Sequence, residues 1–532
     1  MSGLKTTPEE VSEYEVSEAG VGNSETEIRG KFDPNTGVKR GLKTRHISMM
    51  ALAGVIGPGV FVGMGSALHS GGPVGLIAGF CIVGLLVIAM MNCIGELNTL
   101  YDFNFTLHCS RWVDPGFGAA IGWCYVMLWL CNTISEYVSL TSILAYYTDK
   151  VPLYGWFLIM WFIFTVFQTL GVSAFGESEY ILSFIKLLFL SGVYLFSIIY
   201  AAGGIPGHSP GNPFKEFPLA HGFKGIANSF VYAGVFYSGV EAVSMTTSEA
   251  RNPKKAVPIA VRQTIWRILF VYLGASIAYG ITVPWNDPNL SLSNKTMRAP
   301  ITIALTNAGW ANAGYFSTTI ILVTCLSSIN SSIYLASRSL FNLATEGNAP
   351  KIFSTVDKRG NPWIAIHVCH LFGFLSLLAI SSGSSVAYGY IINLSGVCSF
   401  IVWTAIALAQ IRFRKGWLAN GYQKENILFQ VPLYPLTSIF AVFLGLLLVL
   451  VQGWSTLKPF DAGNFVDVYI MIPVFFIMWA GYSFYYKKFW IPYHEMDFET
   501  GRKDQELTED DLKHANDDPT EKSFFSRIWA NL

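Results

Sequence analysis

Apolar runs separated by short polar stretches recur along the chain from residue 46 to residue 486. Each run is close to the ~20 residues that an α-helix needs to cross a lipid bilayer. The runs and the proline and glycine residues between them predict about twelve spans: residues 46–70, 76–100, 117–146, 153–172, 180–203, 225–248, 264–284, 314–343, 362–381, 388–411, 432–453 and 466–486. We therefore expect an all-α polytopic membrane protein.

The first span is interrupted near its middle. Its segment GVIGPGVFVG, residues 54–63, contains four glycines and Pro58. Proline lacks an N–H group and glycine tolerates non-helical dihedral angles, so the segment favours a broken helix. Irregular backbone at bilayer depth is stable only where it is buried in protein or lines a wet cavity. The pattern predicts a binding site, and the alternative is a close-packed helix crossing.

The sixth span has a similar interruption. The segment AGVFYSGVEAVS, residues 233–244, places Gly234, Ser238 and Gly239 around Tyr237. Interrupted helices five spans apart are typical of an inverted repeat, here residues 46–203 against residues 225–411, with two extra helices at 432–486. Half-helix ends attract a carboxylate, and freed carbonyls accept hydrogen bonds from an ammonium. A zwitterionic α-amino acid fits both ends.

Charge divides the chain into three parts. Of its 35 acidic residues, 19 lie in residues 1–45 and 495–532, so both tails are predicted to be disordered. We expect a cytoplasmic N-terminal tail at 1–45, a transport domain at 46–486 and an acidic cytoplasmic C-terminal tail at 487–532. Lysine and arginine collect before the first span and in alternate loops, which places both termini in the cytoplasm. Asn294, in an Asn-Lys-Thr sequon, would then face outward and is a glycosylation candidate.

Enzymatic motifs are missing from the sequence. It has no HExxH, GxSxG or Walker loop, and its eight cysteines show no metal-binding spacing. We expect neither an enzyme nor a metal site, and no cofactor besides a proton gradient.

Four ionisable residues fall at bilayer depth, where their cost makes them functional candidates: Glu96, Glu136, Glu241 and Lys186. Glu96 has the alternative of holding a helix junction, and Glu136 that of a hydrogen-bonded packing residue. Lys186 lies about seven residues from either polar flank of its span, too far to reach an interface, so it points into the bundle.

Several motifs, in this order, resemble the fungal amino-acid permeases (the yeast amino acid transporter family) of the amino acid–polyamine–organocation superfamily, over residues 41–492. They are GVIGPGVFVG, GELNTL, FGESEYILSFIK, YSGVEAVSMTTSEARNPKKAVPIA, VPWNDPNL, INSSIYLASRSLFNLATEGNAPKIF and RGNPWIAI. The resemblance implies a leucine-transporter-like fold with two added C-terminal helices.

The resemblance also implies roles for individual residues. The carboxylate cradle falls on the backbone of Val55, Ile56, Gly57 and Gly59, and the gating aromatic falls on Tyr237. The ammonium site falls on carbonyls near Ala53 and Gly54 and on Phe236, Tyr237 and Ser238. Asn132, one turn before Glu136, and Ser395 in the tenth span are the expected pocket walls. Pro58 departs from the Thr or Ser of many relatives.

Glu136 matches the family's third-span glutamate, and Lys186 matches the fifth-span lysine whose ammonium replaces a sodium ion. We expect Glu136 to be the first candidate for the proton carrier and Lys186 the second, with Glu96 and Glu241 structural or gating. Lys186 is expected between the first and eighth spans, near Ser327 or Ser328.

The predicted function is secondary active, proton-coupled import of an L-amino acid of unspecified side chain. A facilitator or exchanger and a permease-like nutrient receptor are the alternatives. The predicted location is the plasma membrane, with an internal membrane as the alternative. Lys5 and Lys31 are ubiquitination candidates for ligase adaptors, or else solvated linker residues. No nucleic-acid partner is expected.

Overall fold

The computed structural model describes residues 46, 49, 56–101, 103–245, 253–292, 297–357, 359–381, 384–427, 429–457 and 459–502. Lys5, Lys31, Ala53, Gly54, Val55 and Asn294 lie outside these residues. The helices of the described part are η2 (Gly59–Gly63), α3 (Met64–Leu100), α4 (Phe105–Trp112), α5 (Pro115–Leu144), α6 (Leu153–Gln168), α7 (Val172–Ala201), α8 (Pro213–Glu216), α9 (Phe223–Tyr237), α10 (Ala242–Met245), α11 (Pro253–Trp266), η4 (Arg267–Leu273), α12 (Gly274–Thr282), η5 (Pro288–Ser291), α13 (Pro300–Asn307), α14 (Ala313–Thr345), η6 (Lys351–Ser354), α15 (Trp363–Leu371), η7 (Phe372–Leu377), α16 (Leu378–Ser381), α17 (Ser384–Ala419), η8 (Lys424–Asn426), α18 (Leu436–Val451), η9 (Trp454–Thr456), α19 (Ala462–Tyr469), α20 (Met471–Tyr486) and η10 (Tyr493–Glu495).

The all-helical fold class is confirmed, because every predicted span contains helix in the structure. In the described part of the chain, eight helices are long and apolar enough to cross a membrane. The count is below twelve because some spans are short or broken and because the first two spans are continuous. Gly72, with φ 71° and ψ 175°, turns the chain between them just before Pro73.

Two predicted boundaries were wrong. The fifth span begins at Val172 rather than at residue 180, and the helix of the seventh span begins at Pro253 rather than at residue 264. Polar residues occupy the early turns of both helices, so hydropathy alone placed their starts too late.

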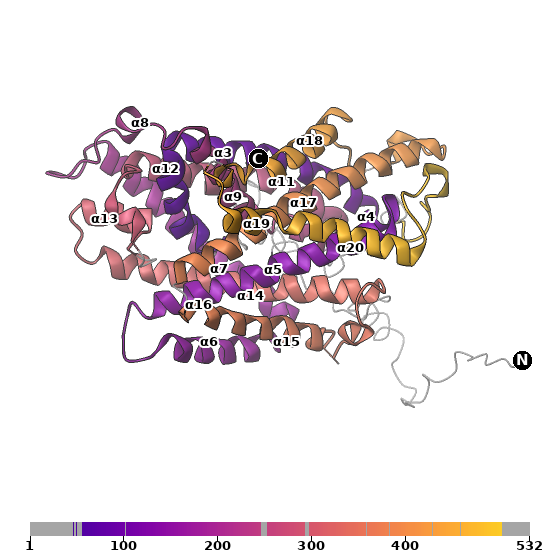
Figure 1. The fold of residues 1–532 in the computed structure, drawn as a ribbon, viewed down its shortest axis with the longest axis horizontal. Coiled ribbons are helices and arrows are strands. Elements are labelled where there is room, and N and C mark those ends of the chain that lie inside the picture. The colour runs from indigo at the N-terminus through magenta and orange to yellow at the C-terminus, as the bar shows by residue number, and fades with distance from the viewer. Residues whose placement is uncertain are drawn as a thin grey trace, which may run out of the picture.

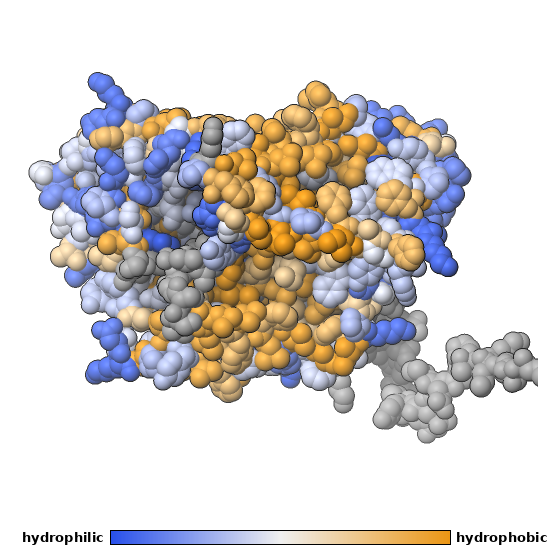
Figure 2. Space-filling view, in the orientation of Figure 1, coloured by the Kyte–Doolittle hydropathy of each residue, from blue (hydrophilic) through white to orange (hydrophobic). Residues whose placement is uncertain are grey.

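The helices pack around α5, which contacts both α14 and α17, while α9 lies against α3. Figure 1 shows α5, α14 and α20 running along the long axis, with α6 and α15 side by side along the lower edge. In Figure 2 an apolar belt crosses the middle of the molecule and hydrophilic residues gather at both ends. Large apolar side chains such as Phe162, Leu188 and Phe443 are exposed, as expected of a lipid-facing surface. The arrangement brings the two predicted breaks into the centre of the bundle.

Candidate substrate-binding site

The sixth span is broken where the sequence predicts. Helix α9 ends at Tyr237, Ser238 is extended, Gly239 adopts φ 92°, and helix resumes at Ala242. A positive φ strains any residue with a Cβ atom, so glycine suits position 239. The break interrupts the hydrogen-bond ladder of the span.

The buried carboxylate of Glu241 stabilises this break. The amide of Gly239 donates to Glu241 Oε1 at 2.9 Å, and Trp403 Nε1 donates to Oε2 at 3.0 Å. Glu241 thus joins the break to α17 and does not line the cavity described below. Of the two roles expected for this residue, structural or gating, these contacts correspond to the structural one.

The described part of the first span contains the far side of its break. Ile56 and Gly57 are non-helical, and a helix begins directly after Pro58. The amides of Phe61 and Val62 both donate to the Pro58 carbonyl. The amides of Gly59 and Val60 therefore lie ahead of the first hydrogen-bonded turn, where helix N-termini bind anions.

Phe236 brings the two breaks together. A Cβ atom added to Gly59 would lie 2.4 Å from the ring of Phe236, and one added to Gly63 would lie 2.2 Å from it. Both distances are shorter than any real Cβ contact, so both glycines are required for the ring to lie across the first span. Phe236 is 9 % exposed and is the aromatic side chain that covers the break.

A small cavity of about 30 Å³ lies between the two breaks. Its lining comprises six residues that the sequence predicts, Gly57, Gly59, Asn132, Glu136, Phe236 and Ser238, and five others, Val60, Trp129, Ser135, Val235 and Ser328. One water needs ~10–15 Å³ by this kind of measure, so the cavity holds about two waters and no amino acid. In this state the cavity is therefore too small to hold an amino acid.

Three predicted residues do not line the inner cavity. Ile56 lies in the buried core. Ser395 Oγ donates to the Ile391 carbonyl at 2.9 Å and lies one turn from Ser399, which bonds Ser238. The prediction of Tyr237 as the gating aromatic differs from the structure. Its hydroxyl donates to the Phe80 carbonyl at 3.0 Å, and its side chain does not line the cavity. One residue is 100° of helix rotation, so sequence alone did not separate Tyr237 from Phe236.

Glu136 lies on the wall of the cavity beside the first break. Ser328 Oγ on α14 donates to Glu136 Oε1 at 2.9 Å. A Cβ atom added to Gly57 would lie 2.9 Å from the same oxygen. The third and eighth spans therefore place an ionisable group directly against the backbone that forms the predicted cradle.

Lys186 is buried in α7, and sequence reasoning missed its neighbour Glu179. Glu179 Oε2 accepts from Ser327 Oγ at 2.6 Å, and Oε1 accepts from Asn330 Nδ2 at 3.0 Å. The carboxylates of Glu179 and Glu136 both attract the Lys186 ammonium. The seven-residue spacing of Glu179 and Lys186, two helical turns, was a usable signal, but Glu179 fell just outside the predicted span.

Arg267 in the seventh span is a second buried cation that the sequence reading missed. Its Nη2 donates to Tyr272 Oη at 2.9 Å, and Tyr272 Oη donates to the Phe236 carbonyl. Tyr272 lies five residues further along the same span, and its hydroxyl makes the contact with the sixth span. Through Tyr272, this cation is connected to the residue that covers the first break.

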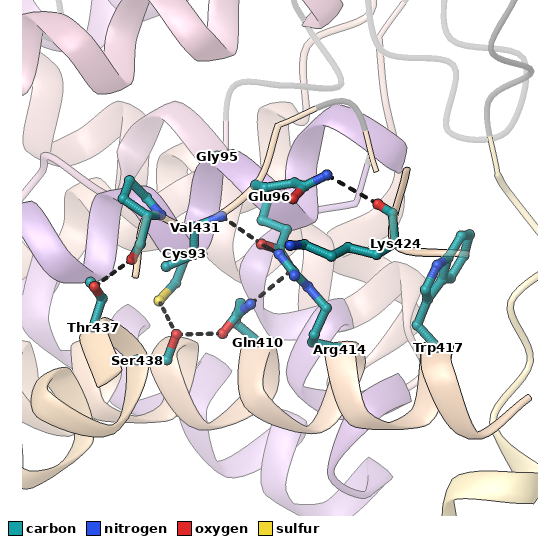
Figure 3. Close-up of polar contacts among 12 residues, drawn as sticks. Cys93, Gly95, Glu96, Gln410, Arg414, Trp417, Lys424, Val431, Thr437 and Ser438 are labelled. Carbon is teal, nitrogen blue, oxygen red and sulfur yellow. Dashed lines mark hydrogen bonds and ion pairs between the residues drawn. The ribbon is translucent and has the colours of Figure 1, made fainter. Parts of the chain in front are cut away.

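Glu96 lies at the other end of α3, in the polar cluster of Figure 3. Arg414 binds its carboxylate through Nε at 2.6 Å and through Nη2, and Gln410 Nε2 and the Val431 amide each donate to it at 2.8 Å. Ser438 Oγ continues the network by donating to Gln410 Oε1 at 2.7 Å. Glu96 therefore joins α3, α17 and the segment before α18, and does not line the inner cavity.

Comparisons with known proteins cover almost the whole chain. The amino acid permease family matches residues 46–494. The chain belongs to this family. An uncharacterized amino-acid permease of Schizosaccharomyces pombe is 59% identical over 99% of both chains. The general amino acid permease AGP3 of Saccharomyces cerevisiae is 47% identical over 85% of this chain and 82% of its own length.

Solved structures of similar fold include a manganese transporter of Eremococcus coleocola. It aligns with a TM-score of 0.53 at 14% identity, over 88% of this chain and 96% of that one. At this identity the likeness concerns the fold alone. The permease is thus a multi-pass membrane transporter with the leucine-transporter-like fold, and not an enzyme.

Proposed function

We propose that this permease imports an L-amino acid across the plasma membrane, coupled to inward movement of protons. Family membership supports amino-acid transport. The observation that carries the coupling is the contact between the first break and Glu136, whose Oε1 lies 2.9 Å from the position of a Cβ on Gly57. A substrate carboxylate at this backbone changes the electrostatic surroundings of a group that exchanges protons.

The two breaks offer complementary partners for a zwitterion. The amides of Gly59 and Val60 face a carboxylate at the start of a helix. The broken end of α9 offers main-chain carbonyls to the ammonium. The Phe236 carbonyl already accepts from Tyr272 Oη, but a carbonyl oxygen has two lone pairs and accepts a second donor.

Coupling uses the charges that surround the first break. Lys186 lies in the field of two carboxylates, Glu179 and Glu136, and of a second cation, Arg267, so these four buried groups balance when all are ionised. A proton on Glu136 leaves one excess positive charge, which is costly at bilayer depth and which a substrate carboxylate at the first break would balance. Protonation of Glu136 in the outward-facing state and its release after reorientation would link proton movement to substrate movement.

Radiolabelled uptake of the twenty common L-amino acids into a permease-deficient yeast strain tests this function. We expect accumulation above the external concentration, external alkalinisation during uptake, and loss of accumulation with a protonophore. The variant Glu136→Gln should retain counterflow but not accumulation. Glu425→Gln, an exposed carboxylate in η8, is the matched control and should behave as the wild type.

The other functions give different results in the same assay. A facilitator or exchanger would show counterflow that is insensitive to the protonophore. A nutrient receptor would show amino-acid-dependent signalling with no uptake of any amino acid. Either result would overturn proton-coupled import.

Placement of both termini in the cytoplasm belongs to the same proposal, as does recognition of the tails by ubiquitin-ligase adaptors. Lys5 and Lys31 are the acceptor lysines in this proposal. Replacing both by Arg should slow nitrogen-triggered endocytosis, measured with a C-terminal fluorescent tag. Unchanged turnover would leave these lysines as linker residues.

A further inference from the structure

A second, larger cavity of about 390 Å³ lies between the transport core and the two added helices. It is bounded by α9, α17, the end of α18 and the segment that leads into α19. Its volume is within the ~300–1,000 Å³ of small-molecule sites. Asn393 in its wall and Arg414 of the Glu96 cluster lie 21 residues apart on α17, about 30 Å of helix. The cavity is therefore at the end of the bundle away from that cluster.

Gln452 is the observation that points to a ligand. The side chain is 1 % exposed and lines the cavity. Neither its Nε2 nor its Oε1 has a hydrogen-bond partner among the residues that the structure describes. Buried polar groups are normally paired, so an amide with both a donor and an acceptor left over indicates a polar occupant.

The charges of the wall indicate which occupant fits. Lys224, at the start of α9, supplies a cation, and Asp461, at the start of α19, supplies an anion. Asn393, also in the wall, donates through Nδ2 to Asp467 Oδ2 at 2.8 Å, so a second carboxylate lies next to the cavity. A ligand with a carboxylate and an ammonium complements this wall. The Gln452 amide would then hydrogen-bond either these charged groups or a polar side chain of the ligand.

The larger cavity is adjacent to the substrate site. Tyr232 lies in its wall and Phe236 in the wall of the inner cavity, one turn apart on α9, with ring centroids 6.1 Å apart. We propose that the larger cavity is an outer amino-acid site, from which a zwitterion passes Phe236 to reach the inner cavity. The path rests on the proposed function, but binding in the outer site does not require transport.

Cysteine protection in the purified full-length protein, held in lipid nanodiscs, tests the outer site. Ser455→Cys places a thiol in the cavity wall, and Ser291→Cys places one on an exposed turn as the matched control. Seven of the eight native cysteines are buried and Cys81 is half-buried, so background labelling by a charged methanethiosulfonate is low. Nanodiscs expose both faces, so the assay does not depend on orientation.

We expect at least one of the twenty common L-amino acids, at 10 mM, to slow labelling of Cys at position 455 at least fivefold and to leave position 291 unaffected. Its amide and its des-amino analogue should protect at least tenfold less well. Gln452→Leu should raise the half-protecting concentration at least tenfold while thermal stability is kept or increased, because it removes two unpaired buried atoms.

Protection must persist when Gly59→Val disrupts the inner cavity. Loss of protection in that background would mean that the outer thiol only reports the inner site, and it would overturn the proposal. Normal labelling with no protection by any amino acid would overturn it as well, leaving a water-filled cavity. Transport is measured separately, so normal uptake without protection refutes the outer site alone, whereas protection without uptake refutes only the proposed function.

Discussion

Glu179 and Lys186 lie two turns apart on α7, and both side chains are completely enclosed by the bundle. The carboxylate is held by Ser327 and Asn330 from α14, so the pair also connects the fifth span to the eighth. A buried charge that loses its partner is destabilising by about 3–5 kcal/mol. The pair is therefore a structural unit as well as a candidate for coupling.

Replacing Lys186 separates these two roles. Lys186→Met should reduce the accumulation ratio to about 1 while retaining counterflow, because it removes the charge and leaves both breaks intact. The double variant Lys186→Met/Glu179→Gln should recover surface expression without recovering accumulation, since the charges that remain, on Glu136 and Arg267, balance each other. Accumulation at the wild-type ratio in Lys186→Met would identify Lys186 as a packing residue.

Gly59→Val should abolish uptake while the protein still reaches the cell surface. The added Cβ would lie 2.4 Å from the Phe236 ring, so either the ring or the first span must shift. Gly192→Val is the matched control, because a Cβ atom there meets nothing within 4 Å. Normal uptake by surface-expressed Gly59→Val would show that the first break is not part of the substrate site.

Tyr272→Phe should lower the maximal uptake rate by about tenfold, the equivalent of one hydrogen bond of ~1.4 kcal/mol. The Tyr272 hydroxyl links Arg267 to the Phe236 carbonyl. Removing this hydroxyl breaks these hydrogen bonds, so Phe236, which covers the inner cavity, is no longer held by the seventh span. Tyr194→Phe, in which the lost hydroxyl bonds the Phe270 carbonyl away from the cavity, provides the comparison. Equal effects of the two changes would assign Tyr272 to general stability.

Glu96→Gln should lower the free energy of unfolding by about 3–5 kcal/mol, since it leaves the buried Arg414 without its counter-charge. Thermal unfolding in detergent measures the change. The apolar pair Glu96→Leu/Arg414→Met should regain part of the loss. A melting temperature unchanged by Glu96→Gln would contradict the view that this ion pair holds α3 to α17.

Glu346, which follows α14, should make stability depend on pH. Burial raises the pKa of Glu346 to about 7, although hydrogen bonds from Asn104 and Thr106 oppose the shift. Below the ordinary pKa of 4.5 the carboxyl group is protonated in both the folded and the unfolded state, so it does not affect stability. Between pH 4.5 and about 7 only the unfolded state ionises, which lowers the free energy of unfolding progressively, and above about pH 7 the loss is constant. Glu346→Gln should raise stability at pH 8 by up to about 3 kcal/mol and have no effect at pH 4.5. An advantage that is constant across this range would exclude the titration of Glu346 as its cause.

Sequence periodicity was sufficient for the spans and for both breaks, because hydropathy, proline and glycine act locally. It was not sufficient to predict which side chain of one helix lies against a given residue of another. Phe236 and Tyr237 have similar side chains, and only the rotation of α9 against α3 decides which of them covers Gly59. Five predicted pocket residues and the predicted proton carrier Glu136 line one cavity. Gly57, Gly59, Phe236 and Ser238 could be placed there because proline and glycine reveal a broken helix in the sequence itself.

Other features depend on contacts between distant segments. Arg267 is enclosed by residues of its own and the sixth span, and Gln452 becomes an unpaired buried amide only when the added helices pack on the core. The family motif that includes Glu179 contained a usable signal, the two-turn spacing to Lys186. It was lost because a hydropathy boundary is uncertain by several residues.

The turn at Gly72 has a mechanical consequence. It is the one residue with non-helical angles between Met64 and Leu100, so the first and second spans are two helices that meet at a kink. The Ala220 amide donates to the Gly71 carbonyl and the Val74 amide donates to the Pro218 carbonyl, so this corner is pinned to the segment before α9. With the corner pinned and the far end of the second span held to α17 by Glu96 and Arg414, the second span is anchored at both ends, and the kink is a joint about which the first span can tilt without carrying the second span with it.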